Sequence, residues 1–212
     1  SLYLAALELD EQPISDIRDL KFDRLIDTTL FEADSLGEKL PAPITCRTFD
    51  AVVGNPPWTF VKKELGADRR RTSDSSTLRP RRSPDQAFLS LGAELAGVHG
   101  RVGMVMKATP FFSKDVHAVA ARNHLLAHLA PVALINLSYL RREDLFPDAV
   151  GPALLFFARC GLGPQADRML VGSIPWTPDF RRTGVFGLGP GEIRSIPLKR
   201  VLATPTFLKA AT

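Results

Sequence analysis

Membrane-spanning segments are absent from this 212-residue sequence, because no apolar run approaches the roughly 20 residues that cross a bilayer. The first residues carry no basic stretch and no cleavage signal of the kind that directs export. Hydrophobic residues make up 45% of the chain and charged residues 24%, a composition that allows one sizeable core. We therefore expect a cytoplasmic globular protein.

Cysteine is scarce as well. Cys46 and Cys160 are the only two, and they lie far apart in the sequence. They match neither a CxxC pair nor a metal-binding cluster. We expect two buried free thiols in a reducing compartment.

A histidine-based metal site is not expected either. His117, His124 and His128 share one face of a predicted helix, which permits a pair of ligands. No third ligand with suitable spacing follows, so a solvated helix face is the favoured interpretation and no metal is predicted. Arg122 lies on the same helix, either exposed or in contact with phosphate.

Positive charge is concentrated in one segment of the chain. The net charge is +4, and the segment from Thr59 to Pro84 alone carries +5. This segment is rich in Arg, Ser, Thr and Pro, which predicts a long loop suited to a polyanionic partner. Its eight basic residues are Lys62, Lys63, Arg69, Arg70, Arg71, Arg79, Arg81 and Arg82.

Apolar runs alternate with helical patterns along most of the chain, which predicts an α/β fold. We expect a mostly parallel sheet with helices on both faces. After Gly161 the pattern loosens into short strands and turns. The expected helices span residues 2–9, 85–96 and 114–129, and the expected strands span residues 28–33, 49–53, 102–108, 132–137 and 153–158.

The tetrapeptide Asn55-Pro56-Pro57-Trp58 follows a buried strand directly. Open α/β sheets bind ligands beyond the carboxyl ends of their strands. Each proline fixes its own φ and restricts the residue before it, so the turn is stiff. Because proline has no N–H, the turn offers mainly hydrogen-bond acceptors, with an aromatic ring beside them.

This acceptor set suits one kind of chemistry. An amine conjugated to an aromatic ring is a poor nucleophile, since its lone pair is delocalised into the ring. The Asn55 side-chain oxygen and the Pro56 carbonyl can each accept one of its N–H groups and free the lone pair. Trp58 can stack on the ring. Taken alone, Asn-Pro-Pro can equally be an ordinary turn.

The stretch from Phe49 to Trp58 resembles the catalytic motif of N6-adenine DNA methyltransferases. The likeness is strongest to the gamma-class enzymes of bacterial restriction-modification and phage-defence systems. Residues 30–36, residues 100–106 and the pair of segments 145–147 and 153–157 resemble further motifs of this family, in the right order. The matching segments cover roughly residues 1 to 160.

The resemblance implies methyl transfer from S-adenosylmethionine to N6 of an adenine flipped out of double-stranded DNA. The implied catalytic residues are Asn55, Pro56, Pro57 and Trp58. The target base would stack on Trp58 and Phe146, and Asp34 would lie near the adenine of the cofactor. Lys62, Lys63, Arg69, Arg70 and Arg71 are the candidate DNA-phosphate contacts.

The sequence departs from the family pattern at several positions. Trp58 stands where Tyr or Phe is usual, and Lys107 stands where the motif of strand five commonly ends in Pro. The helix from Asp85 has Ala87 and Ser90 where aromatic residues are often found. Stacking on Trp58 remains feasible, and Trp in place of Tyr or Phe implies a base pocket of a different shape.

The Gly-rich cofactor loop of the family is missing from the sequence. We expect a partial Rossmann-like methyltransferase fold that lacks its first two strands, a fragment inactive alone. Residues 1–160 would form the catalytic core with the basic loop 59–84, and residues 161–212 an extension toward a DNA recognition region. The family's strand order places the expected strands as 49–53, 102–108, 153–158, 132–137, with an open edge at the first.

Two other functions stay open. The similar Asn-Pro-Pro-aromatic turn of other methyltransferases acts on a glutamine amide in a protein or on a base in ribosomal RNA. Alternatively, the chain is a catalytically inactive remnant that binds DNA. The basic segment and the Phe146 motif favour DNA methylation.

The basic segment generates a first prediction. If it contacts DNA phosphates, affinity for DNA falls steeply as salt rises, because bound counterions are released on binding. Deleting residues 66–84 is expected to flatten the slope of log affinity against log salt concentration. Fluorescence anisotropy with labelled duplex DNA measures the slope, and an unchanged slope would refute the assignment.

Overall fold

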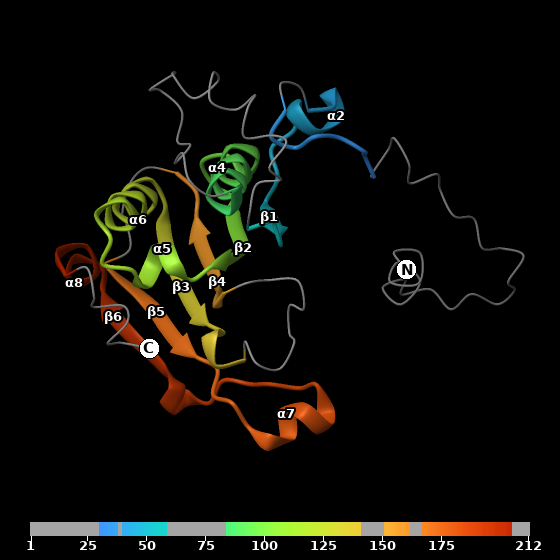
Figure 1. The fold of residues 1–212 in the computed structure, drawn as a ribbon. Coiled ribbons are helices and arrows are strands. Elements are labelled where there is room, and N and C mark those ends of the chain that lie inside the picture. Colours follow the sequence, from blue (N-terminus) through green and yellow to red (C-terminus); the bar gives the residue numbers. More distant parts are fainter. Residues whose placement is uncertain (1–29, 38–39, 59–83, 141–150, 162–166, 205–212) are drawn as a thin grey trace, which may run out of the picture. The chain divides into compact units, whose positions relative to one another are not determined.

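The computed structural model describes residues 30–37, 40–58, 84–140, 151–161 and 167–204 (Figure 1). The chain divides into two compact units, Ser1–Ile44 and Thr45–Thr212. In the described part of the first unit, Leu30 forms an isolated bridge and residues 31–34 have no regular structure. The strand expected over residues 28–33 is therefore wrong for residues 31–33. The helix expected over residues 2–9 lies outside the described residues.

The second unit is built on a six-stranded sheet with the order β1-β2-β4-β3-β5-β6. Strands β1, β2, β3 and β5 run in one direction, and β4 and β6 run against them (Figure 1). The strands are β1 (Ala51–Gly54), β2 (Arg101–Lys107), β3 (Ala130–Asn136), β4 (Ala153–Arg159), β5 (Arg168–Ser173) and β6 (Ile193–Pro197).

The sheet confirms most of the expected pattern. The four strands expected after residue 48 are all present, and β1-β2-β4-β3 is the order that the resemblance implied. The α/β fold class is confirmed. The sheet is mixed rather than mostly parallel, because β4 pairs antiparallel with both β2 and β3, and β6 pairs antiparallel with β5.

Alternate residues of the central strands build the core on one face of the sheet. Met104, Met106, Leu134, Leu154 and Phe156 are all buried there. This alternation follows from the two-residue period of a strand, which sends successive side chains to opposite faces. The helices that pack on this face complete the core.

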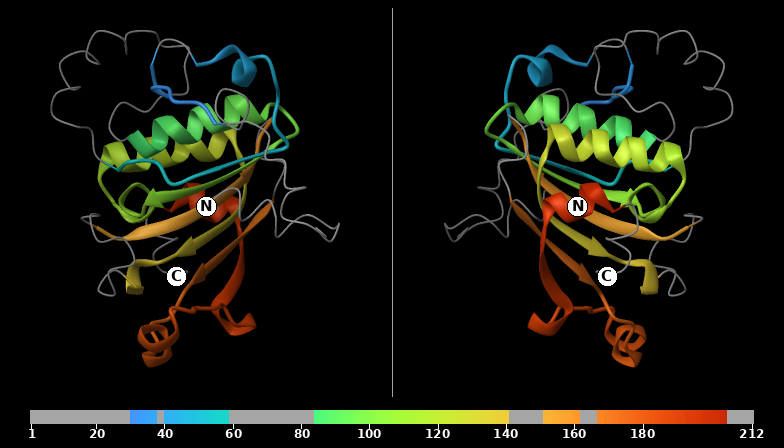
Figure 2. Two further views of the ribbon diagram at one scale, coloured as in Figure 1. Left: turned by 90° about the vertical axis from the view of Figure 1, so that its right-hand side faces the viewer. Right: turned by 90° about the vertical axis from the view of Figure 1, so that its left-hand side faces the viewer.

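Four helices contribute buried residues to this core. Gly92 of α4 lies so close to the sheet that an added Cβ would come within 2.7 Å of the Met104 methyl carbon, so α4 packs tightly on β2. Figure 2 shows α4 and α6 side by side along the sheet. The helices are α4 (Pro84–Ala96), α5 (Thr109–Phe112), α6 (Val116–His128) and α8 (Leu198–Ala203).

Helices were expected on both faces of the sheet. Among the described residues of the second unit, the helices that pack into the core cover one face, and apolar side chains of the other face are exposed. None of the described helices is long and apolar enough to cross a membrane.

Residues after Gly161 continue the sheet. Strand β5 pairs in parallel with β3, and β6 pairs with β5. Between them lie α7 (Pro178–Thr183) and a 3₁₀ turn, Pro190–Glu192. Gly184 ends α7 in the left-handed conformation, with φ of 68°, and so serves as the C-terminal cap of this helix.

Gly161 follows β4 by two residues, at the edge of the sheet where the parallel strand β2 begins. Its φ is +114°, and a Cβ added there would lie 2.4 Å from the carbonyl oxygen of Val98. Any other residue at position 161 would therefore have a strained backbone conformation, and its Cβ would also overlap backbone atoms of Val98.

Gly161→Ala is expected to lower the free energy of unfolding by about 2–4 kcal/mol, because strain and steric overlap add. Gly184→Ala is the matched control, since its φ is 68° and nothing lies within 4 Å of the added Cβ. This control should cost only about 1 kcal/mol. Urea denaturation monitored by circular dichroism measures both, and equal losses would contradict the packing argument.

Candidate active site

The turn Asn55–Trp58 leaves β1 at the carboxyl ends of the parallel strands. Gly54, the last residue of β1, is level with Met104 of β2. Strand β2 continues for three more residues to Lys107, so the turn begins just short of the level at which β2 ends. This edge is where open α/β sheets bind ligands.

Exposure alternates along the turn. Asn55 is exposed, Pro56 is buried and Pro57 is exposed. The buried ring of Pro56 holds the turn against the protein, and the Asn55 side chain remains open to solvent. The turn therefore presents its amide side chain at the edge of the sheet, from a backbone that the prolines make stiff.

Trp58 packs against a second apolar cluster at the same edge. Its ring is half-buried. The buried members of the cluster come from residues that follow β3 and β5 and from the start of β4: Leu137, Leu140, Ala153, Ile174 and Phe180. Contact with this cluster fixes the position of the indole relative to the strand ends.

Asp85 ties the start of α4 to the end of β2. Its side chain is fully buried; Oδ2 accepts a hydrogen bond from the Lys107 amide at 2.9 Å, and Oδ1 accepts from the Gln86 amide at 3.0 Å. A negative charge in the first turn of a helix is also favoured by the helix dipole. The carboxylate thus holds β2 in place beside the turn.

Gln86, the next residue, is 3% exposed. Its Oε1 atom has no hydrogen-bond partner among the described residues. Because buried polar atoms are nearly always hydrogen-bonded, we expect this oxygen to accept a hydrogen bond from a group other than the described residues. Its place in the first turn of α4 puts it near the end of β2.

A polar network joins the ends of β3 and β5. The buried Asn136 donates from Nδ2 to Ser173 Oγ at 3.2 Å, and its Oδ1 accepts from the Ser138 amide at 3.0 Å. These bonds fix the backbone immediately before Leu137, which belongs to the cluster under Trp58.

The structure brings together only some of the predicted site residues. Asn55, Pro56, Pro57 and Trp58 form one continuous turn in the second unit. Asp34 lies in the first unit; it is exposed, and its Oδ1 accepts from the Leu36 amide at 3.1 Å. Phe146 and the basic residues Lys62, Lys63, Arg69, Arg70 and Arg71 lie outside the described residues.

Three other sequence expectations can be compared with the structure. Cys160 is a buried free thiol as expected, and burial raises its pKa, whereas Cys46 is exposed. Arg122 is 1% exposed, which corrects both earlier options of an exposed or a phosphate-bound side chain. Its Nη1 donates to the Phe111 carbonyl at 2.8 Å, and burial lowers its pKa.

Asp85 and Asn136 were not identified from the sequence. A signal for Asp85 existed, because an acidic residue after Pro84 at the start of an apolar helix is typical of a helix N-terminus. Asn136 at the end of a strand gave no such signal. In the part of the chain that the structure describes, no group of three or more metal-ligating side chains occurs.

The sequence profile of the N-6 DNA methylase family matches residues 14–146. This match covers the turn Asn55–Trp58, α4, β2, α6 and β3. The chain belongs to this family. A search of curated proteins finds no significant match.

Solved structures support the fold. The type IIG restriction endonuclease BpuSI matches with a TM-score of 0.55 at 18% identity, over 77% of this chain and 21% of that protein. A chain from a type I restriction-modification system matches with a TM-score of 0.50 at 16% identity, over 76% of this chain and 37% of the other. This chain thus spans well under half the length of either matched chain.

The Asp85 bridge generates a prediction about the site's framework. Asp85→Ala is expected to lower the free energy of unfolding by about 2–4 kcal/mol, since two backbone N–H groups lose a charged acceptor in a buried place. Asp85→Asn keeps one acceptor oxygen and should cost less. Asp115→Ala is the control: this residue is exposed, precedes α6, and accepts a long bond of 3.3 Å from the Ala118 amide.

The control should cost at most about 1 kcal/mol. Chemical denaturation gives all three values. Equal losses for Asp85→Ala and Asp115→Ala would show that the bridge to Lys107 contributes nothing beyond an ordinary helix start.

Proposed function

We propose that this chain is the catalytic part of a site-specific DNA methyltransferase. It transfers a methyl group from S-adenosylmethionine to N6 of a flipped adenine, within a bacterial restriction-modification or phage-defence system. The observation that carries the proposal is the exposed Asn55 held by the buried Pro56 at the carboxyl end of β1.

Asn55 and Pro56 supply the acceptors. The Asn55 side-chain oxygen and the Pro56 carbonyl oxygen each accept one N–H of the adenine amine. These two bonds draw N6 toward tetrahedral geometry and localise its lone pair. They also stabilise the positive charge that develops on N6, and acceptors fixed in advance cost no reorganisation.

The methyl transfer needs no catalytic base, because the attacking N6 lone pair is made available by the two hydrogen bonds. When bound, S-adenosylmethionine would supply the methyl group to the N6 lone pair and would keep the electron pair of the broken C–S bond as a neutral thioether. The methylated amine then loses one proton to water.

The flipped base needs aromatic faces to replace the stacking that it loses in the duplex. Trp58 supplies one face, and its contact with the apolar cluster of Leu137 and Phe180 holds the ring in place. Phe146 supplies the second face. Base–aromatic stacking contributes about 1–3 kcal/mol per base, which offsets part of the cost of flipping.

S-adenosylmethionine is the methyl donor that this chemistry requires. We assign Asp34 to contact with its adenosine part. The described residues provide no Gly-rich turn between a strand and a helix that would hold the rest of the donor.

Lys62, Lys63, Arg69, Arg70 and Arg71 follow the turn directly in the sequence and are assigned to DNA phosphates. Phosphate contacts of this kind position a protein on DNA without reading its sequence. Membership of the N-6 DNA methylase family favours adenine in DNA over a glutamine amide or a ribosomal RNA base.

Substitution of Asn55 in the complete gene product tests the proposal. Asn55→Ala removes one acceptor and is expected to lower N6-methyladenine formation by about 100- to 1000-fold. Asn55→Asp keeps an acceptor oxygen and should retain more activity than Asn55→Ala. Mass spectrometry of nucleosides from digested plasmid DNA measures the product directly.

Glu94→Gln is the control, because Glu94 is an exposed residue in the interior of α4. It should leave product formation unchanged. N6-methyladenine that persists at the normal level in Asn55→Ala would overturn the assignment of the turn. Methylation of protein or ribosomal RNA in place of DNA would overturn the substrate.

A further inference from the structure

Lys107 is the last residue of β2 and stands between two parts of the candidate active site. In the strand order β1-β2-β4, the turn that begins at Asn55 lies on one side of it and the start of β4 on the other. Its side chain is half-buried. Its backbone amide belongs to the Asp85 bridge, whereas its ammonium group plays no part in that bridge.

The side chain of Lys107 lies on the face of the sheet that also carries Trp58. Met106 is buried under the helices, so the next residue, Lys107, points to the other face. Lys107 is directly opposite Ala153 of β4, which belongs to the apolar cluster against which Trp58 packs. Directly opposite side chains lie about 5 Å apart at Cβ, so the lysine stem runs beside this cluster.

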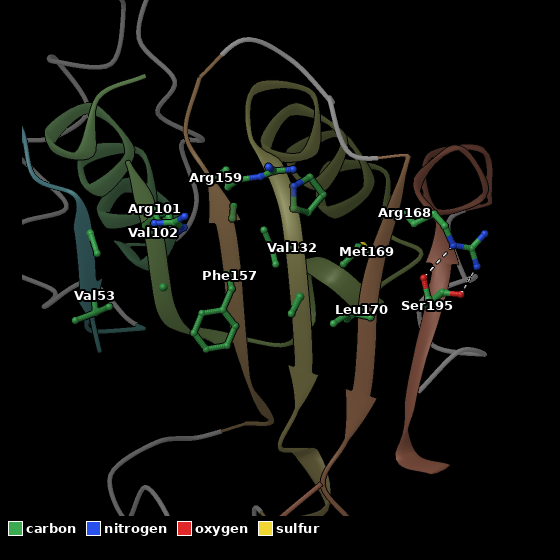
Figure 3. A pocket seen from close by; sticks show the side chains of 15 residues that line it. Val53, Arg101, Val102, Val132, Phe157, Arg159, Arg168, Met169, Leu170 and Ser195 are labelled. Carbon is green, nitrogen blue, oxygen red and sulfur yellow. Dashed lines mark hydrogen bonds between the residues drawn. The ribbon is translucent and has the colours of Figure 1, made fainter. Parts of the chain in front are cut away.

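Asn55 lies on the same face and close by. Val53 lines this face (Figure 3), and Asn55, two residues later, is exposed as well. The register places Gly54 level with Met104, so Lys107 is only two residues farther along than Asn55. With about 4.8 Å between strands and about 3.3 Å per residue, the two Cα atoms lie roughly 8 Å apart. The flexible four-carbon stem of lysine can cover much of that distance.

The Lys107 stem extends beyond the end of the sheet. A Cβ added at Gly151 would lie 3.8 Å from Lys107 Cε, and Gly151 precedes the first residue of β4 by two. Because β4 runs antiparallel to β2, residues that precede β4 lie beyond the carboxyl end of β2. The ammonium group therefore lies at the edge where a substrate is expected, and not in the core.

This ammonium group has no anionic partner in the part of the chain that the structure describes. Asp85 accepts a hydrogen bond from the Lys107 backbone amide, and none of the described carboxylates forms an ion pair with the side chain. A half-buried ammonium loses part of its hydration, which an anion compensates. An unpaired positive charge also opposes methyl transfer nearby, because positive charge develops on N6 of the adenine. Methyl transfer thus favours an anion beside Lys107.

DNA supplies such an anion together with the target base. A flipped nucleotide stays attached to the backbone, so the phosphates on either side of it remain near the mouth of the pocket. Lysine binds phosphate as a compact charge with three hydrogen-bond donors. Phosphate contacts fix the position of a nucleotide without reading its base.

We propose that Lys107 binds a backbone phosphate adjacent to the flipped adenine and so holds the target nucleotide beside Asn55. This inference rests on the proposed methylation of DNA. The contact differs from those assigned to the basic segment, because it is made to the nucleotide that reacts. It also neutralises the ammonium group in the complex in which the methyl group is transferred.

Salt dependence of DNA binding tests the proposal in the complete gene product. The probe is a labelled duplex that carries the site of methylation, mapped by locating N6-methyladenine in plasmid DNA. Lys107→Met should weaken binding about tenfold and flatten the slope of log affinity against log salt concentration by about one. Lys107→Arg keeps the charge and should stay within about twofold of the wild type.

Lys199→Met is the matched control, because Lys199 is an exposed residue of α8 at the opposite edge of the sheet. It should leave the affinity and the slope unchanged. The Asp85 bridge uses the backbone amide of Lys107, so Lys107→Met is expected to fold, and thermal melting checks this. In steady-state kinetics, Lys107→Met should raise KM for DNA about tenfold and change kcat much less.

Neutral phosphates identify the contact directly. A methylphosphonate replaces the phosphate on the 5′ side or the 3′ side of the target adenine in two separate duplexes. For the wild type, one of the two replacements should weaken binding about tenfold. For Lys107→Met the same replacement should cost at most about twofold, because the partner of that phosphate is already gone.

Three results would overturn the role of Lys107 alone: an unchanged salt slope in Lys107→Met, equal methylphosphonate losses in both proteins, or weaker binding of S-adenosylmethionine by the variant in calorimetry. The last result would assign the ammonium group to the carboxylate of the methyl donor. A wild-type protein that forms no N6-methyladenine in DNA would overturn the proposed function and this contact with it.

Discussion

The antiparallel pairing of β2 with β4 determines the arrangement of everything else in the second unit. Seven consecutive residue pairs join these strands, and β4 pairs antiparallel with β3 on its other side. Strand β3 therefore runs in the direction of β2. The carboxyl ends of β1, β2, β3 and β5 meet at one edge, and Arg101, Arg159 and Arg168 meet at the other. One pairing therefore sets which residues lie at the active-site edge and which lie at the opposite edge.

The active-site edge is stabilised mainly by hydrogen bonds to backbone amides. Burying the Asp85 carboxylate is unfavourable by itself, because the charge loses its hydration. Two amide donors, from Gln86 and Lys107, compensate for this loss. The side-chain amide of Asn136 likewise forms two hydrogen bonds at the ends of β3 and β5, one to Ser173 and one from the Ser138 amide. Polar side chains fix these strand ends, so the turn that carries Asn55 lies beside a well-defined backbone.

The features that the sequence predicted correctly are those that depend on residues close together in the chain. Prolines dictate the backbone of the Asn55–Trp58 turn, and alternating patterns dictate β2, β3 and β4, so both were predictable. The bridge from Asp85 to Lys107 joins residues 22 positions apart, which no local pattern encodes. Arg122 was misjudged for the same reason, since charge suggested solvent while the packing of α6 on α5 buried it. The one-sided helix layer also depends on tertiary packing, which periodicity does not report.

The candidate active site depends on a short edge strand, β1. This strand is four residues long, lies at the edge of the described sheet and pairs there with β2. Val53 precedes Asn55 by two residues, so the position of the Asn55 side chain follows from the pairing of β1 with β2. On its other side the turn is held by the buried Pro56 and by the contact of Trp58 with the apolar cluster of Leu137 and Phe180. Because the prolines fix the backbone between these two anchors, the edge strand and the cluster together determine where Asn55 lies.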